Sequence, residues 1–81
     1  MKQIIDVRRP EKFKEGHLPD AINIPFNYIL DRLDKLDKNN EILLYCQDGK
    51  ISHSVETVLK IEGYNARSIG AYPILRQNST N

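Results

Sequence analysis

The chain contains one cysteine, Cys46, and its surroundings make it the first residue to consider for chemistry. It ends the most apolar segment of the sequence, and a short polar loop, Gln47–Lys50, leads from it into a predicted helix. Parallel sheets bind ligands at the carboxyl ends of their strands, and N–H groups of a loop and a helix N-terminus stabilise a thiolate placed there. Gly49 gives the loop access to backbone conformations that other residues avoid. These features favour a reactive Cys46, although a free cysteine is also a common small buried side chain.

The residues around Cys46 restrict the chemistry that it can perform. Without a second cysteine, the chain cannot form an internal disulfide, a multi-cysteine zinc site or a dithiol oxidoreductase centre. A cysteine phosphatase needs an arginine six positions after its nucleophile to bind the phosphoryl oxygens, and that position is Ser52. The remaining alternatives are persulfide formation, reaction with a thiol of another molecule, or no reaction. Lys50 adds a positive charge to this region, and Ser52 and Ser54 add hydroxyl donors.

The composition indicates one small globular domain. The 81 residues include 12 Lys and Arg against 11 Asp and Glu, and a net charge of +1 gives no electrostatic basis for binding nucleic acid or a membrane surface. Hydrophobic residues make up 40% and charged residues 28%, which is typical of a folded protein. The longest apolar run, Ile42–Cys46, is far shorter than the roughly 20 residues of a membrane span, and the N-terminal residues lack the apolar stretch of a signal peptide. We therefore predict a cytoplasmic single domain over residues 1–81.

Short strands and helices alternate along the chain. Apolar runs bounded by turn residues predict strands at 2–7, 21–24, 41–46 and 64–69. Apolar spacing, with Ser52 and Gly63 as end signals for the third helix, predicts helices at 10–15, 26–36, 52–62 and 72–76. This alternation implies an α/β fold with a mainly parallel central sheet and helices on both faces. Leu30, Leu33 and Leu36 are expected to face the core, and residues 77–81 to form a frayed tail.

Two segments of the chain resemble motifs of the rhodanese (thiosulfate sulfurtransferase-like) family. The first is Ile5–Pro25, with the sequence IDVRRPEKFKEGHLPDAINIP, which is similar to the long opening signature of these domains. The second is Tyr45–Ser52, with the sequence YCQDGKIS, which is similar to the family's cysteine loop. The resemblance covers about residues 4–72. In length the chain resembles the short single-domain members of the phage shock protein E type.

The resemblance implies a small rhodanese-like domain that transfers sulfane sulfur. Cys46 would attack the outer sulfur of thiosulfate or a related donor, and the resulting persulfide would pass that sulfur to cyanide, a small thiol or a protein thiol. The resemblance implies no metal or organic cofactor. The alternatives are a non-catalytic rhodanese-like module that binds a partner or senses redox state, and a phosphate- or arsenate-directed thiol enzyme, which Ser52 disfavours.

The site that this resemblance implies has three parts. Cys46 is the catalytic residue, and its persulfide is expected to bind backbone N–H groups of residues 47–51. Asp6 and Arg8 are supporting residues, expected to form a structural ion pair near the loop. The loop that binds substrate and persulfide consists of Gln47, Asp48, Gly49, Lys50, Ile51 and Ser52.

Two residues of this loop depart from the family pattern. Family loops often carry arginine where this chain has Ile51, which leaves Lys50 as the main charge for an anionic donor. Asp48 adds a negative charge beside the same site. Both departures weaken the case for thiosulfate as the donor and leave persulfide chemistry at Cys46 unaffected. Arg9, next in the chain after Arg8, is expected to be a solvated surface charge.

Overall fold

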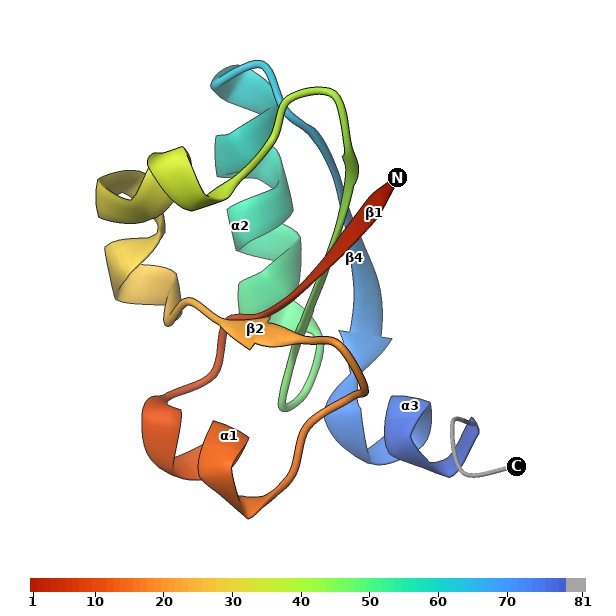
Figure 1. Cartoon of the computed structure of the whole chain (residues 1–81). Helices are drawn as coiled ribbons and strands as arrows, with labels where there is room; N and C mark the ends of the chain where they lie inside the picture. Colours follow the sequence, from red (N-terminus) through yellow and green to blue (C-terminus); the bar gives the residue numbers. More distant parts are fainter. Residues whose placement is uncertain (79–81) are drawn as a thin grey trace.

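The most apolar segment of the chain forms β3 (Glu41–Cys46), an interior strand of a four-stranded sheet. The computed structural model describes residues 1–78 and pairs β3 with β1 (Lys2–Asp6) on one side and β4 (Asn65–Ala71) on the other. The two-residue strand β2 (Ile22–Asn23) pairs with the outer side of β1. Every pairing is parallel, so the carboxyl ends of the strands meet at one edge of the sheet (Figure 1). This edge carries Cys46.

Helices cover both faces of the sheet. The 3₁₀ helix η1 (Phe26–Lys35) and the helix α2 (Lys50–Ile61) pack on one face, and α1 (Pro10–Glu15) and α3 (Tyr72–Asn78) pack on the other (Figure 1). The predicted α/β fold, with its parallel sheet and its helices on both faces, is therefore confirmed. Within residues 1–78, no helix has both the length and the apolar character needed to cross a membrane.

Side chains of β3 alternate between the two faces, and both faces are apolar. Ile42, Leu44 and Cys46 pack against the face covered by α2, whereas Tyr45 packs against the face covered by α1 and α3. The strand is buried on both sides, which explains why its sequence is a continuous apolar run rather than an alternating one. Cys46, the last residue of the strand, is buried in the same core cluster as Ile42 and Leu44.

The segment expected to form a regular helix at 26–36 is different in the structure. It forms the 3₁₀ helix η1, which is interrupted at Arg32 with φ −121° and ψ 24°. Residues three apart share one face of a continuous 3₁₀ helix, but the break at Arg32 lies between Leu30 and Leu33, so the two side chains belong to separately oriented turns. Leu36 is buried and Leu33 is half-buried, but Leu30 is 56% exposed, so the prediction that Leu30 faces the core is wrong.

Three boundaries differ by two residues from those predicted, and several others differ by one. Ser52 or its neighbour was expected to cap the third helix. The helix begins instead at Lys50, after Gly49, so Ser52 lies inside the first turn and does not cap it. The last strand ends at Ala71, two residues later than predicted. The last helix continues through Gln77 to Asn78, two residues that were expected to belong to a frayed tail, and residues 79–81 lie outside the described part of the chain.

Candidate active site

Strand β3 delivers Cys46 to the start of a tight turn that bends around its sulfur. The residue is only 2% exposed, and its Sγ accepts hydrogen bonds from the N–H groups of Gly49 at 3.1 Å and Ser52 at 3.3 Å. Gly49 adopts a left-handed conformation with φ +88°, which an L-residue adopts only at a cost of about 1–2 kcal/mol. Donors arranged in this way stabilise negative charge on the sulfur.

The thiol group of Cys46 also has two oxygen acceptors within reach. Ser52 Oγ lies 3.5 Å from Sγ, and Asp48 Oδ1 lies 3.7 Å from it. The Ser52 side chain is fully buried, donates to the carbonyl of Gly49 at 3.2 Å and shares a 2.7 Å hydrogen bond with the hydroxyl of Ser68 on β4. A line of hydroxyl groups therefore connects the sulfur to the neighbouring strand. Sequence reasoning missed Ser68, because nothing in the local sequence distinguishes it from any other strand serine.

Asp48 is exposed and carries its negative charge next to the sulfur. Its Oδ1 atom accepts the backbone N–H of Lys50 at 2.9 Å, and this hydrogen bond lowers the pKa of Asp48 below its usual value. Asp48 is therefore a carboxylate at neutral pH. The backbone N–H of Lys50 was expected to bind the sulfur, but it donates to Asp48 instead. The N–H of Ser52, which lies one residue beyond the expected 47–51, donates to the sulfur.

A pocket of about 310 Å³ opens at Cys46. We refer to it as the cysteine pocket; its lining residues are Val7, Arg8, Arg9, Lys12, Phe26, Cys46, Gln47, Asp48 and Ile51. Three cations line it, all from the segment after β1. Lys50, predicted to be the main cation at the site, is the first residue of α2, is exposed and does not line this pocket. Arg9, predicted to be a solvated surface charge, is exposed and also lines the pocket.

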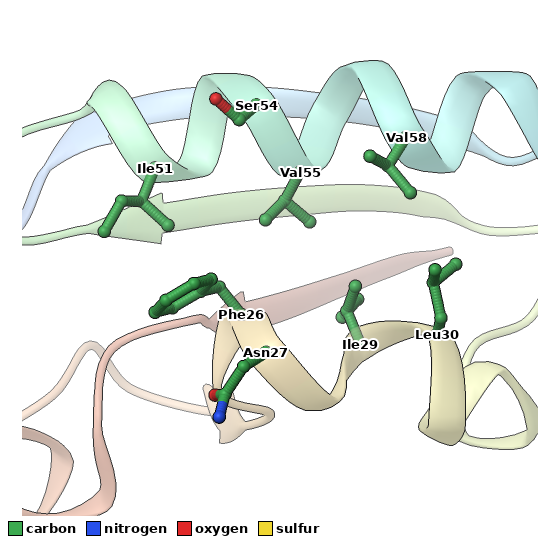
Figure 2. Close-up of a pocket in the computed structure, with 8 residues that line it drawn as sticks. All are labelled: Phe26, Asn27, Ile29, Leu30, Ile51, Ser54, Val55 and Val58. Atoms are coloured by element: carbon green, nitrogen blue, oxygen red, sulfur yellow. The ribbon is translucent and has the colours of Figure 1, made fainter.

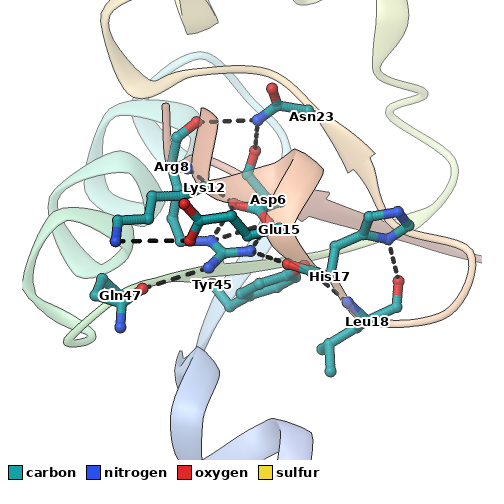
Figure 3. A network of polar contacts seen from close by, with 10 residues as sticks. Asp6, Arg8, Lys12, Glu15, His17, Leu18, Asn23, Tyr45 and Gln47 are labelled. Carbon is teal, nitrogen blue, oxygen red and sulfur yellow. Dashed lines mark hydrogen bonds and ion pairs between the residues drawn. The ribbon is translucent and has the colours of Figure 1, made fainter. Parts of the chain in front are cut away.

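Asp6 and Arg8 form the expected ion pair (Figure 3), and Arg8 also lines the cysteine pocket. Arg8 Nε lies 3.0 Å from each carboxylate oxygen of Asp6, and Nη2 donates to Oδ2 at 2.7 Å. Nη2 also donates to the carbonyl of Gly16 at 2.7 Å, and Nη1 donates to Oε1 of Gln47 at 3.3 Å. Burial opposes the charge of the guanidinium, but the hydrogen bonds and attraction of Asp6 outweigh it, so the pKa of Arg8 is raised.

Aromatic rings enclose the Arg8 guanidinium on the face of the sheet opposite α2. Its Cζ atom lies 4.1 Å from the ring centroid of Tyr72 and 5.6 Å from that of Tyr45. The Tyr45 hydroxyl accepts the N–H of Leu18 at 3.0 Å, and burial raises the pKa of this tyrosine. At Gly16, a Cβ atom would lie 2.8 Å from the Tyr72 hydroxyl, so a larger residue there would displace the ring that packs on Arg8.

The two histidines lie away from the reacting atom. His17 stacks on Phe13 with ring centroids 3.9 Å apart, and His53 is an exposed residue of α2. Neither lines the cysteine pocket. Within residues 1–78, no group of three or more His, Cys, Asp or Glu side chains is arranged to hold a metal ion.

Comparison of the sequence with known proteins finds one family model and several relatives. Residues 1–72 match a family model described as the rhodanese-like domain. The thiosulfate sulfurtransferase PspE of Escherichia coli is 37% identical over 62 residues, which cover 74% of this chain and 60% of that protein. A sulfurtransferase of Allochromatium vinosum is 30% identical over 61 residues, which cover 75% of this chain and 57% of that protein. The chain thus spans about half the length of the curated relatives it matches.

Solved structures also resemble the chain over most of its length. A rhodanese with anions from E. coli superposes with a TM-score of 0.84 at 32% identity, covering 90% of this chain and 89% of that one. A rhodanese-like domain protein from Staphylococcus aureus superposes with a TM-score of 0.83 at 32% identity, covering 89% of this chain and 71% of that one. The sequence comparisons and the structural comparisons therefore find rhodanese-like proteins and sulfurtransferases alike.

Proposed function

Because the chain belongs to the rhodanese-like domain family, we propose that it is a sulfurtransferase that carries sulfane sulfur on Cys46. The observation that carries this proposal is the arrangement at the sulfur. Two backbone N–H groups point to Sγ, and the pocket in front of it is lined by Arg8, Arg9 and Lys12. An anionic sulfur nucleophile and an anionic donor are both stabilised by such surroundings.

In the first step, the Cys46 thiolate attacks the outer sulfur of thiosulfate or a related donor. A new bond forms between Sγ and that sulfur, and the sulfur–sulfur bond of thiosulfate breaks. Sulfite leaves with the electron pair, so the charges of both sides balance. The amides of Gly49 and Ser52, which bind Sγ in the free thiol, stabilise the thiolate before the attack.

In the second step, a nucleophile takes the outer sulfur from the persulfide. Cyanide attacks it and leaves as thiocyanate, or a thiolate attacks it and leaves as a new persulfide. In either case the bond to Sγ breaks, and its electron pair returns to Cys46 as the thiolate. The acceptor is a small molecule or a protein thiol, and neither step uses a metal or an organic cofactor. A cytoplasmic location and the absence of nucleic-acid and membrane partners stay predictions from the sequence.

The charges around the pocket have opposite effects on an anionic donor. Arg9 and Lys12 are exposed at the pocket and attract it, whereas Asp48, 3.7 Å from Sγ, repels it. Arg8 is held by Asp6 and Gln47, and its role is to position the loop. This balance makes thiosulfate a weaker donor than it would be in a pocket without Asp48.

A non-catalytic binding or redox-sensing module is the alternative function. A binding module would share the buried Cys46 but has no need for amides that stabilise a sulfur anion, whereas a redox sensor would use those amides too. Thiocyanate formation from thiosulfate and cyanide distinguishes the two, with the Cys46→Ser variant as the control. Turnover that is lost in this variant, with an unchanged circular dichroism spectrum, supports the sulfurtransferase. Equal turnover in the variant and the native protein would overturn it.

A further inference from the structure

A second hollow lies beside the cysteine pocket, between η1 and α2 (Figure 2). We call it the apolar groove; it has a volume of about 320 Å³. Figure 2 shows apolar side chains of the two helices facing each other across it, namely Phe26, Ile29 and Leu30 from η1 and Ile51, Val55 and Val58 from α2. Leu30, just before the break in η1 at Arg32, is 56% exposed and lines the groove instead of the core.

The apolar groove and the cysteine pocket share two residues. Phe26 and Ile51 line both, and these side chains are 46% and 41% exposed. Ile51 is also part of the cysteine loop, five positions after Cys46. An apolar surface therefore runs from the reacting sulfur along α2. Large apolar side chains gathered in a hollow are typical of a ligand site rather than of an ordinary surface.

We propose that the apolar groove binds the hydrocarbon part of a small aliphatic thiol that exchanges sulfur with Cys46. This proposal rests on the proposed function and names the class of its acceptor. The acceptor thiolate attacks the outer sulfur of the Cys46 persulfide, a bond forms between these two sulfurs, and the bond to Sγ breaks. The electron pair returns to Cys46, and the acceptor leaves as an alkyl persulfide.

The charges around the two hollows favour this occupant. The polar side chains that line the apolar groove, Asn27 and Ser54, are uncharged, whereas the cations Arg8, Arg9 and Lys12 lie in the cysteine pocket. A charged substituent would lose hydration in the groove without gaining a partner. An uncharged alkyl chain loses nothing polar on entering it, and a volume of about 320 Å³ is at the small end of ligand sites.

The test measures how fast the persulfide passes its sulfur to n-alkanethiols of increasing length. The protein is first loaded with sulfur from thiosulfate or polysulfide and is then mixed with ethanethiol, butane-1-thiol or hexane-1-thiol. These thiols have nearly equal intrinsic reactivity, so a dependence on length reports binding. Full burial of one CH₂ group corresponds to a factor of about four, and a groove open on one side covers about half of the chain. We expect the second-order rate constant to rise about 15-fold from ethanethiol to hexane-1-thiol.

Two variants connect this dependence to the groove. Leu30→Asn places an amide at the rim, where the native side chain is 56% exposed, so the fold is retained. This variant is expected to lose most of the increase in the rate constant with thiol chain length. The rate constant for sulfur transfer to 2-mercaptoethanol should not change. Ile61→Asn is the matched control, since Ile61 is also exposed and lies on α2 outside the groove. It is expected to retain the native dependence.

The contrary results separate failure of the groove proposal from failure of the proposed function. Rates that do not change with chain length in the native protein would overturn the groove proposal alone. The same conclusion would follow if Leu30→Asn kept the full dependence of the rate on chain length. It would also follow if methyl signals of the groove in NMR spectra shifted with protein concentration and not with hexane-1-thiol, because a second copy of the chain would then occupy the groove. Absence of any sulfur on Cys46 after loading would overturn the proposed function, and this proposal with it.

Discussion

Arg8 donates a hydrogen bond from Nη1 to Oε1 of Gln47 across 3.3 Å, and this contact joins the segment after β1 to the residue that follows Cys46. The other donors of the guanidinium bind Asp6 and the carbonyl of Gly16. These contacts fix the orientation of the guanidinium from which Nη1 donates to Gln47. A buried ion pair on one face of the sheet thereby positions the start of a loop that bends around a sulfur on the other face.

Replacement of Arg8 by lysine tests this connection. Arg8→Lys retains a positive charge but cannot contact Asp6, Gly16 and Gln47 together, because an ammonium group lacks the planar fork. We expect a loss of about 3 kcal/mol in the free energy of unfolding, since buried hydrogen bonds to a charged group are lost. Urea denaturation measures it, with Arg9→Lys as the control at an exposed position, where the change should stay within about 0.5 kcal/mol. Equal effects of the two variants would contradict the positioning role.

Removal of the Asp48 charge should improve the use of an anionic donor. Asp48→Asn keeps an oxygen for the Lys50 amide and removes the negative charge 3.7 Å from Sγ. We expect kcat/KM for thiosulfate to rise about fivefold at low ionic strength, and less at high salt, because the site is open to solvent. Asp34→Asn, an exposed position on η1, serves as the control. A rate that falls in Asp48→Asn would show that this carboxylate assists the reaction.

The structure and the sequence make different predictions about which lysine attracts the donor. Lys12 lines the cysteine pocket, whereas Lys50 lies outside it. We therefore expect Lys12→Gln to raise the KM for thiosulfate about threefold and Lys50→Gln to change it little, both measured by steady-state kinetics over a range of salt concentrations. A larger effect of Lys50 would restore the sequence-based assignment.

Alanine variants of two glycines distinguish the loss of stability caused by backbone strain from an effect on sulfur transfer. Gly49, with φ +88°, precedes α2 at the sulfur, and Gly63, with φ +92°, follows the same helix at its far end. Alanine at either position should cost about 1–2 kcal/mol of stability by urea denaturation, because both residues are left-handed. Only Gly49→Ala should also slow sulfur transfer, by at least about tenfold, since it disturbs an amide that binds Sγ. Similar activity of the two variants would mean that the Gly49 amide has no role in the reaction.

Much of the architecture could be predicted from the sequence, because it depends on local patterns. The continuous apolar run of β3 requires burial on both faces, which indicates a parallel sheet, and a cysteine at its end must then lie at the edge where the loops gather. Asp6 and Arg8 are separated by one residue, which favours side chains on the same side of an extended segment. They do pair in the structure, although β1 ends at Asp6.

Other features depend on geometry that no local pattern specifies. The three- and four-residue spacing of apolar residues from Phe26 to Leu36 is typical of an α-helix. Only the packed structure shows a 3₁₀ helix that is broken at Arg32 and leaves Leu30 exposed. Lys50 was expected at the pocket because it is close to Cys46 in sequence, yet the cations that line the pocket come from residues about forty positions earlier. Ser68 reaches Ser52 through the pairing of β3 with β4, which is a tertiary contact.

The central claim is that Cys46 carries sulfur, and intact-protein mass spectrometry tests it most directly. The protein is incubated with thiosulfate, or with polysulfide, and is measured before and after the addition of cyanide. We predict a gain of one sulfur atom, located on Cys46, that cyanide removes. Unchanged mass with both donors, in a protein whose Cys46 is still accessible to alkylation, would contradict it.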